Sequence, residues 1–467
     1  MLFYLSITAD KTLLLNKKIY IIILLTFTVS TIEIPDYNID WNDSQRIFQI
    51  ILIIASSAII IFKKNTVNLK TAYLVLALGL ISSLNAQHYD IALKEWGRYA
   101  GLLIITLLTA QLSETKKTLK LILYILAASA FINSFQFIVS YAAAFSTGIL
   151  KLNADLLLNG FSNPRFLNQF QMLFMPILAY LALHHWQATH RYSKLLAVVL
   201  FSTLLIHWCI AFTLGSRGLW LGLAVCYAGL IILFPKFWRL LAVQASAGVL
   251  GFTLYYFMFF IVPEWVGIEA SVRNNLRLGM SGREVIWQMA WDMFLAHPLL
   301  GVGPMHFSAV VNSIAAHPHQ VVLQWLAEWG LLATLAAIFV AFSGMLHGLK
   351  VIRSNAEEHI DAALWMSILG ALALAQVDGV FVMPYTETWL AIIVGLALSR
   401  WAKTHYESRW QTYFLRTLAI SVIFIFGNVL INEAPTLIED SKAHMEKHGT
   451  GFTPRFWMQG WIPMDGK

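Results

Sequence analysis

Long apolar runs occupy nearly the whole of this 467-residue chain, and they constrain its fold more than any other feature. A run of about 17–25 apolar residues can cross the hydrocarbon core of a bilayer as a helix. About thirteen runs reach this length, or twelve if one of them is re-entrant. They cover roughly residues 18–34, 46–62, 70–86, 97–112, 119–145, 169–185, 194–214, 217–234, 239–262, 321–346, 360–377, 385–402 and 414–431. We therefore expect an all-α polytopic integral membrane protein with about 12–13 transmembrane helices.

The composition excludes the main soluble alternatives. Hydrophobic residues make up 58% of the chain and charged residues 12%, about half the charged share of an ordinary soluble domain. The formal net charge of +7 would suit nucleic acid, but no basic cluster lies in a soluble module that could follow a phosphate backbone, so we expect no nucleic-acid partner. Cys209 and Cys226 lie inside apolar runs, which supports neither a disulfide framework nor a cysteine metal site.

Lysine and arginine residues mark alternate short loops, and positive side chains resist translocation across a membrane. The loops that hold them, from Lys17 and Lys18 to Arg400 and Lys403, should face the cytoplasm. We expect a multi-pass membrane protein whose remaining loops face outward, into the periplasm if the cell is Gram-negative. Its expected units are N-terminal transmembrane helices (1–262), a large periplasmic loop (263–320), C-terminal transmembrane helices (321–431) and a periplasmic tail (432–467).

The outward segment 263–320 is more cationic than a periplasmic loop needs to be. Its basic residues are Arg273, Arg277, Arg283, His297, His306, His317 and His319. One explanation is an anionic ligand at the outer membrane surface, such as a lipid diphosphate, which arginine binds well through its planar fork. The alternative for any one arginine is pairing with lipid phosphates or with Glu264, Glu269 and Glu284.

Four motifs follow one another on this outer side. They are Ser216-Arg217-Gly218 in a tight turn; Ser281-Gly282-Arg283; the string from His297 to Phe307 that reads His-Pro-Leu-Leu-Gly-Val-Gly-Pro-Met-His-Phe; and His317-Pro318-His319-Gln320 before a helix containing Leu323, Leu326, Glu328, Gly330 and Leu331. From its turn alone, Arg217 would be an interfacial arginine that reaches toward water. The order and spacing of the four motifs resemble the O-antigen ligase superfamily, which comprises O-antigen ligases, O-antigen polymerases and pilin-type protein O-oligosaccharyltransferases. Many members have Asn where this chain has Gln320, which retains the amide.

The resemblance implies a C-type membrane glycosyltransferase that moves a whole glycan from a polyprenyl (undecaprenyl) diphosphate carrier to an acceptor hydroxyl, with no metal and no cofactor. Negative charge builds on the departing diphosphate, and fixed guanidinium groups stabilise it. We expect Arg217 and Arg283, and then Arg165, to bind the diphosphate. A neutral imidazole suits proton removal from the acceptor, and His319 matches the histidine of the family.

Five further residues are secondary candidates, each with a structural alternative. They are His317, Glu328, Asn168, Gln169 and Asp378. His317 precedes a proline and suits a loop, and a helix containing both histidines would place them roughly 200° apart. Glu328 is expected on nearly the same helical face as His319, in a structural pair with an arginine. The two amides suit sugar hydroxyls or their own loop, and Asp378 could pair with an arginine, tune His319 or remain solvated.

The acceptor and the general class remain open at this level. The preferred acceptor is a Ser or Thr of an exported protein such as a pilin, because residues 163–171 and the Gly-Val-Gly-Pro-Met-His-Phe string resemble the pilin-type enzymes. Ligation of O-antigen to lipid A core, or polymerisation, is the alternative. A lipid-linked oligosaccharide transporter would place charges near the midplane of its spans, and a membrane scaffold would leave the cationic residues unexplained. The tail is expected to lie on the membrane or to contribute to acceptor binding.

Overall fold

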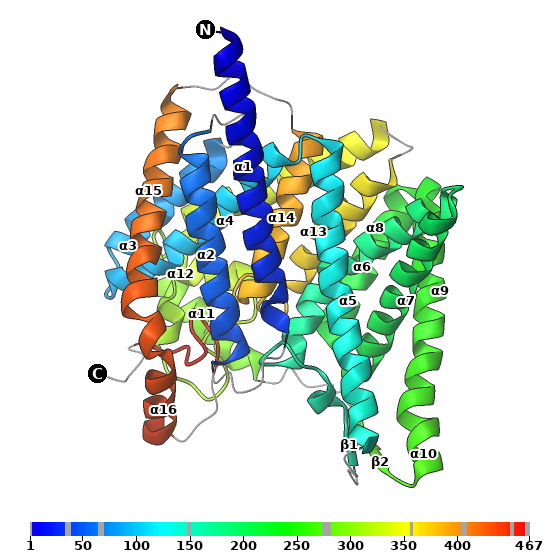
Figure 1. Ribbon diagram of the computed structural model, residues 1–467. Helices are drawn as coiled ribbons and strands as arrows, with labels where there is room; N and C mark the ends of the chain where they lie inside the picture. The colour runs from blue at the N-terminus through cyan, green and yellow to red at the C-terminus, as the bar shows by residue number, and fades with distance from the viewer. Residues whose placement is uncertain are drawn as a thin grey trace.

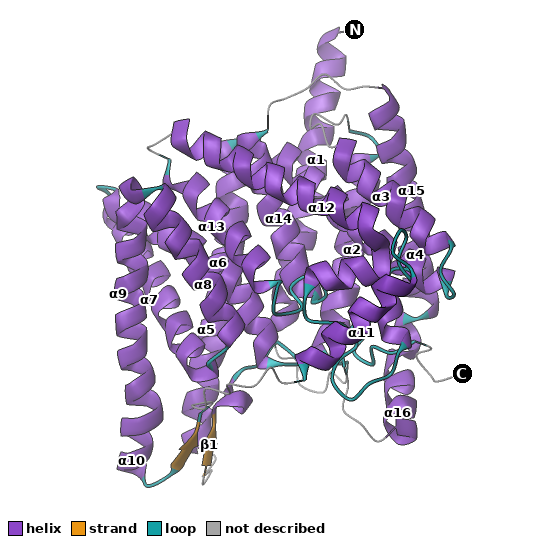
Figure 2. Ribbon diagram, turned by 180° about the vertical axis from the view of Figure 1, so that it is seen from behind, coloured by secondary structure: helices purple, strands orange, loops and turns teal. Residues whose placement is uncertain are grey.

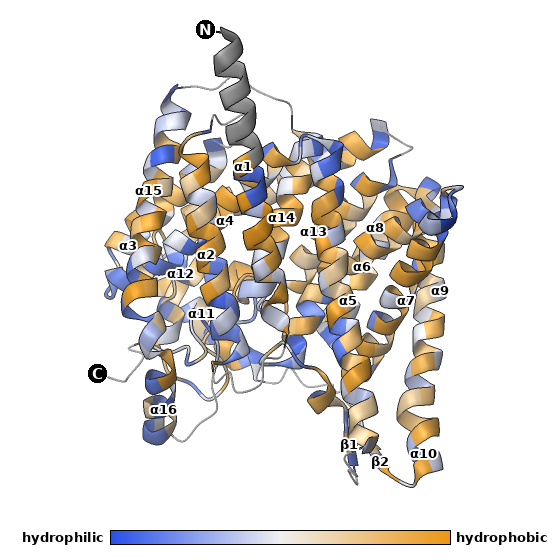
Figure 3. Cartoon of the chain, viewed as in Figure 1, coloured by the Kyte–Doolittle hydropathy of each residue, from blue (hydrophilic) through white to orange (hydrophobic). Residues whose placement is uncertain are grey.

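A computed structural model of the chain describes residues 2–32, 39–63, 70–146, 151–272, 282–354, 358–402, 409–448 and 453–462, the first of these over 2–14 by backbone alone. Arg273, Arg277 and Ser281 of the sequence prediction lie outside the described residues. The described part is an upright bundle of helices, with hydrophobic residues along the helices and hydrophilic residues collected toward the two ends (Figures 1 and 3).

Every expected apolar run overlaps a helix, which confirms the all-α polytopic architecture. The helices are α1 (Leu2–Thr28), α2 (Trp41–Ile60), α3 (Lys70–Leu84), α4 (Tyr89–Leu112), α5 (Lys116–Ser146), α6 (Pro164–Gln187), α7 (Arg191–Leu214), α8 (Arg217–Leu233), α9 (Trp238–Tyr256), α10 (Val262–Val266), α11 (Arg283–Ala296), α12 (Val321–Ser354), α13 (His359–Leu374), α14 (Pro384–Trp401), α15 (Arg409–Asn432) and α16 (Leu437–His448). Seven helical stretches among the described residues are long and apolar enough to cross a membrane unaided, while α3, α8 and α13 are apolar but shorter.

The helices alternate in direction, so the starts of α2, α4, α6, α8, α12 and α14 meet at one end of the bundle. The short helix α11 lies across this end, and α16 stands below it (Figure 2). We call it the α11 end. The opposite end holds the N-terminus and the short loops rich in lysine and arginine (Figure 1).

Two helical columns extend past the rest of the bundle at the α11 end (Figure 1). One is α5, and the other is the continuous stretch that contains α9 and α10. Helix α5 has 31 residues, so it spans about 46 Å, which exceeds the roughly 30 Å of a hydrocarbon core. Beyond α5 and α10, β1 (Lys151–Asn153) pairs in parallel with β2 (Glu269–Ser271), with Leu152 opposite Ala270. The apolar runs of the sequence do not predict this small sheet.

Helix α12 is broken, and the His-Pro-Leu-Leu-Gly-Val-Gly segment fills the break. Gly330 has φ 77° and ψ 177°, which separates a first limb (321–329) from a second limb (331–354). The break frees carbonyl groups that a continuous helix would use. The N–H of Val302 donates to the carbonyl of Ala327 at 2.9 Å, and that of Gly303 to Glu328 at 3.0 Å. These bonds orient the first limb independently of the second.

The close approach at the break requires glycine on both sides. A Cβ added at Gly330 would lie 2.2 Å from the carbonyl oxygen of Leu299, and one at Gly301 would lie 2.4 Å from the carbonyl carbon of Glu328. Both glycines have φ between 70° and 77°, a region that side-chain-bearing residues rarely adopt. The His-Pro-Leu-Leu-Gly-Val-Gly string and the helix motif that contains Gly330 therefore contact each other through their backbones.

Replacing Gly330 by alanine should lower the free energy of unfolding by about 2 kcal/mol or more, because strain and overlap with Leu299 act together. Gly344 lies in the second limb with nothing within 4 Å of an added Cβ, so Gly344→Ala is the matched control and should be neutral or slightly stabilising. Thermal unfolding of the two variants in detergent measures the difference. Equal midpoints would contradict the close-approach account.

Candidate functional site

Three of the predicted arginines stand at the starts of three helices at the α11 end. Arg217 and Arg283 are the first residues of α8 and α11, and Arg165 is the second residue of α6. A helix start carries partial positive charge, so a basic side chain there is unfavourable for the helix itself but adds to an anion-binding potential. Ser216, which precedes α8, makes no side-chain capping bond, and Gly282, which precedes α11, has no side chain that could cap the helix.

The guanidinium group of Arg283 interacts with the charges of the other two arginines and of one carboxylate. Burial lowers the pKa of the half-buried Arg283, the carboxylate of Asp378 raises it, and the positive charges of Arg165 and Arg217 lower it. Arg283 therefore lies within electrostatic range of Arg165, Arg217 and Asp378. A Cβ added at Gly218, next to Arg217, would lie 3.8 Å from Oδ2 of Asp378, so the start of α8 is close to this carboxylate. In the sequence, Asp378 was only a secondary candidate.

Asp378 connects this cationic cluster to His319. Its Oδ1 accepts hydrogen bonds from Gln169 Nε2 at 2.9 Å and from the Gly379 N–H at 2.8 Å, and it lies 3.7 Å from Nδ1 of His319. Burial tends to raise the pKa of Asp378, but His319, the Gly379 amide and Arg283 outweigh it and lower that pKa. The carboxylate is therefore held in its charged form beside the imidazole.

His319 itself has an unusual backbone. Its φ is 53°, one of two positive values found among the non-glycine residues described. Such a conformation costs roughly 1–3 kcal/mol and persists only where neighbouring structure enforces it. Nδ1 of His319 is buried with no hydrogen-bond partner among the described residues, and the side chain is 23% exposed. The residue is thus held in place while part of its ring remains accessible.

The ring of His317 packs against the ring of His319. The ring centroids are 4.1 Å apart in an edge-to-face arrangement, and the backbone N–H of His319 donates to Nδ1 of His317 at 3.3 Å. A Cβ at Gly379 would fall 2.5 Å from Cε1 of His317, so the glycine allows the ring to pack there. Burial first, and then the charge of His319, lower the pKa of His317, which keeps it neutral.

The start of α12 corrects one expectation. Because the helix begins at Val321, neither histidine belongs to it, and the argument that Glu328 shares a helical face with His319 is wrong. Gln320 instead caps the first limb, since its Oε1 accepts from the N–H of Leu323, and its Nε2 donates to Gln376 Oε1 at 3.1 Å. The bond from Gln320 to Gln376 and the bond from the Val321 N–H to the Ala375 carbonyl attach the chain next to His319 to the end of α13. They hold His319 next to Asp378.

Asn168 and Gln169 are almost fully buried at 1% exposure each. Asn168 Nδ2 donates to Gln171 Oε1 at 2.7 Å, and Gln169 Nε2 binds Asp378 as described above. The amide oxygens of both residues lack partners among the described residues. Buried acceptors are rarely left unused, so each oxygen needs a donor that the described residues do not supply.

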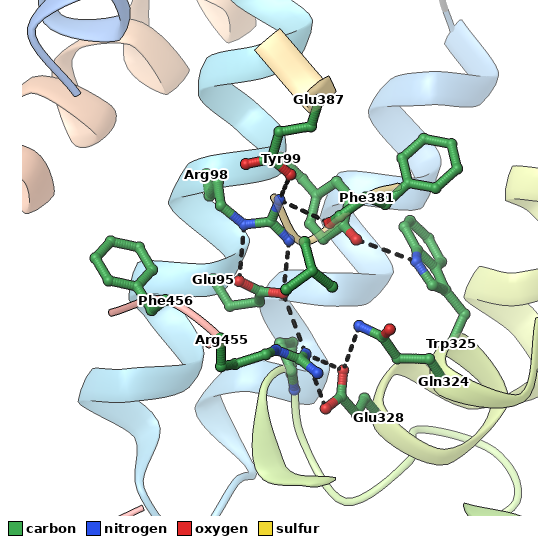
Figure 4. Close-up of polar contacts among 12 residues, drawn as sticks. Glu95, Arg98, Tyr99, Gln324, Trp325, Glu328, Phe381, Glu387, Arg455 and Phe456 are labelled. Carbon is green, nitrogen blue, oxygen red and sulfur yellow. Dashed lines mark hydrogen bonds and ion pairs between the residues drawn. The ribbon is translucent and has the colours of Figure 1, made fainter. Parts of the chain in front are cut away.

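Glu328 belongs to a buried network of charges that the sequence analysis missed. Its two carboxylate oxygens lie 2.9 and 2.7 Å from Nη2 of Arg455, and Oε1 also accepts from the Phe307 N–H at 3.1 Å. Arg455 further contacts Glu95 at 3.2 Å, and Glu95 binds Arg98 at 2.7 Å (Figure 4). The expected arginine partner of Glu328 therefore comes from the C-terminal tail.

The network continues from Arg98 to Glu387 of α14, and Glu387 pairs with Arg46 of α2 at 2.6 Å. Three arginines and three glutamates thus alternate, each at most 1% exposed. All but Arg455 fall within or next to expected apolar runs, where an ionisable residue is by itself a signal of function or pairing. The positions of these charged residues in the sequence therefore indicate a buried network, although they do not show which residues pair.

Replacing Arg98 by methionine should reduce the free energy of unfolding by about 3–5 kcal/mol, because Glu95 and Glu387 each lose an ion-pair partner inside the bundle. The exposed Arg239, at the opposite end, provides a matched control, and Arg239→Met should have little effect. Thermal unfolding in detergent and yield of inserted protein measure both. A stable, well-expressed Arg98→Met protein would show that the network does not hold the bundle together.

Comparison with known proteins places this site in a family. Residues 196–338 match the family model described as O-antigen ligase, and this range includes Arg217, Arg283, His317, His319 and Glu328. No curated protein matches the chain. The match supports an enzyme of the glycan-transferring ligase or polymerase type, and the long apolar helices support a multi-pass membrane protein. The resemblance seen in the sequence is confirmed over residues 196–338, which are similar to the O-antigen ligase family.

Proposed function

We propose that the protein transfers a glycan en bloc from undecaprenyl diphosphate to an acceptor hydroxyl at the periplasmic face of the bacterial inner membrane. The observation that carries this proposal is the placement of three arginines at helix starts of the α11 end, where Arg283 interacts with Asp378 and Asp378 Oδ1 lies 3.7 Å from Nδ1 of His319. In this orientation the α11 end faces the periplasm and the basic loops face the cytoplasm. Segments 1–262 and 321–431 form the transmembrane part, and 263–320 and 432–467 lie on the periplasmic side.

The arginines would bind the diphosphate of the donor. As the acceptor oxygen bonds to the anomeric carbon, the bond from that carbon to the diphosphate oxygen breaks and its electron pair leaves with undecaprenyl diphosphate. Arg217, Arg283 and Arg165 can stabilise the growing negative charge through bidentate bonds. The proposal assigns charge neutralisation to guanidinium groups and helix starts, and it includes no metal and no cofactor.

His319 would take the proton of the acceptor hydroxyl as the new bond forms. With Nδ1 directed at Asp378, the ring presents Nε2 to the acceptor, and the carboxylate stabilises the imidazolium that results. The 3.7 Å separation is short enough for a small rotation to complete a hydrogen bond. His317 and Gly379 support the ring from behind, and the unpartnered oxygens of Asn168 and Gln169 would accept hydrogen bonds from glycan hydroxyls.

The acceptor is proposed to be a Ser or Thr hydroxyl of an exported protein such as a pilin. Ligation to lipid A core or polymerisation is the alternative, since both use the same donor chemistry. A transporter is less well supported, because six buried charges of the described part pair with one another in the network, while the arginines that suit a diphosphate stand at one end.

The acceptor can be tested in a host that supplies a defined undecaprenyl-diphosphate-linked glycan. The chain is co-expressed with a candidate pilin in cells that also carry lipid A core, and glycan is measured on both by mass spectrometry and by gel mobility. We expect glycan on the pilin. Glycan on lipid A core alone would overturn the acceptor assignment, and chains of polymerised glycan alone would identify a polymerase.

His319→Ala should reduce transfer at least about a hundredfold, because no other described imidazole stands at Asp378 with an accessible nitrogen. His190, an exposed histidine at the opposite end, gives the matched control, and His190→Ala should transfer normally. Membrane insertion is checked in both variants by extraction and thermal unfolding. Full transfer by an inserted His319→Ala protein would remove this residue from the mechanism.

A further inference from the structure

Residues 453–462, here named the C-terminal segment, are built into the bundle. Phe456 and Trp457 are each 1% exposed. The carbonyl of Phe456 accepts from Arg46 Nε at 3.0 Å, and the N–H of Met458 donates to Asp43 Oδ1 at 2.6 Å. A segment with these bonds is a fixed part of the fold and does not lie on the membrane surface as a separate helix.

The first link from this segment toward the site runs through a side chain. Arg455 binds both carboxylate oxygens of Glu328, and Glu328 Oε1 also accepts from the N–H of Phe307. Arg455 thereby joins the first limb of α12 to residues 304–308. Because Arg455 presents its guanidinium to two carboxylates at once, its charge and its shape both matter.

The second link runs through the backbone and ends at the histidines. The N–H of Ile462 donates to the carbonyl of Ser308 at 2.9 Å, and Oγ of Ser308 donates to the carbonyl of Ala316 at 2.8 Å. Ala316 directly precedes His317, on which the ring of His319 packs. A Cβ added at Gly460 would lie 3.1 Å from the Cβ of Ala316, so the C-terminal segment also contacts the loop that leads into His317 directly.

We infer that the C-terminal segment positions His317 and His319, and that Arg455 is a positioning residue acting through Glu328 and residues 304–316. Its effect on transfer rests on the function proposed above, whereas its effect on the histidines does not. The described polar contacts of the C-terminal segment go to α2, α4, α12, residues 304–308 and Glu433, which follows α15. Arg165, Arg217 and Arg283 stand on α6, α8 and α11. Disturbing the segment should therefore impair the chemical step more than donor binding.

Two variants of the full-length protein disturb the two links separately. Arg455→Lys keeps the positive charge but removes the planar guanidinium group that contacts Glu328 and Glu95 together. Ile462→Pro removes the N–H that binds Ser308 and leaves every charge in place, so it remains informative if Arg455→Lys fails to insert. Lys442→Ala, an exposed change on α16 in the same tail, is the matched control.

The first measurement does not depend on activity. Diethyl pyrocarbonate modifies accessible neutral imidazoles, and mass spectrometry reads each histidine separately. His317 is 2% exposed and should be protected in the wild type and in Lys442→Ala. Both test variants should increase its rate of modification by about tenfold, because local opening exposes it. Protection of His317 equal to the wild type in inserted Ile462→Pro protein would overturn the inference.

The second measurement is transfer with the defined lipid-linked glycan. We expect kcat to fall by about tenfold or more in both variants while KM for the donor changes less than about twofold, since small misplacement of a reacting group has large effects. A wild-type kcat, or a rise in donor KM with no change in kcat, would overturn the positioning role. Full transfer by His319→Ala would instead refute the proposed function, and the modification of His317 would still decide the inference about the segment.

Discussion

The buried network of three arginines and three glutamates is the interaction on which the rest of the structure depends. It joins α2, α4, α12, α14 and the C-terminal segment at the depth of the first helical turns of the α11 end. Inside a membrane protein no water is available to solvate an unpaired ion, so each member requires its neighbours. Such a network adds little net stability compared with apolar packing, but it strongly disfavours any arrangement that separates the pairs. It therefore fixes which helices are adjacent beneath the site.

Next to this network, the broken helix α12 holds the residues of the candidate site. The segment 297–303 occupies the break, and the first limb has the cap residue Gln320 before its start and Glu328 near its end. The bonds made by Glu328 and Gln320 at the two ends set the direction of this short limb. His319 can then hold a left-handed backbone conformation next to Asp378, because both sides of the chain around it are fixed.

The features predicted from the sequence are those that depend on local pattern. Apolar runs predicted the helices, and the motifs drew attention to Arg217, Arg283 and His319, which the structure places at one end with Asp378. Pairings between distant residues were not predictable from one sequence: Gln169 and Asp378 were separate candidates, 209 positions apart, and nothing in either segment indicates the hydrogen bond between them. The break at Gly330 was missed for a related reason. A glycine within a long apolar run has the same periodicity whether the helix continues or stops, and only the approach of Leu299 decides the outcome.

The place of Arg455 in the chain has a consequence for how the protein is made. Membrane helices are inserted in order of synthesis, and Arg98 can pair with Glu95 as soon as α4 exists, because both belong to the same helix. Arg46 must wait for Glu387 of α14, and Glu328 must wait for Arg455, which is translated after all the helices of the bundle. A nascent bundle therefore carries an acidic excess at Glu328 until the C-terminal segment folds back between the helices. If this segment positions His317 and His319 as inferred above, a partly assembled protein in the membrane has not yet formed the proposed site.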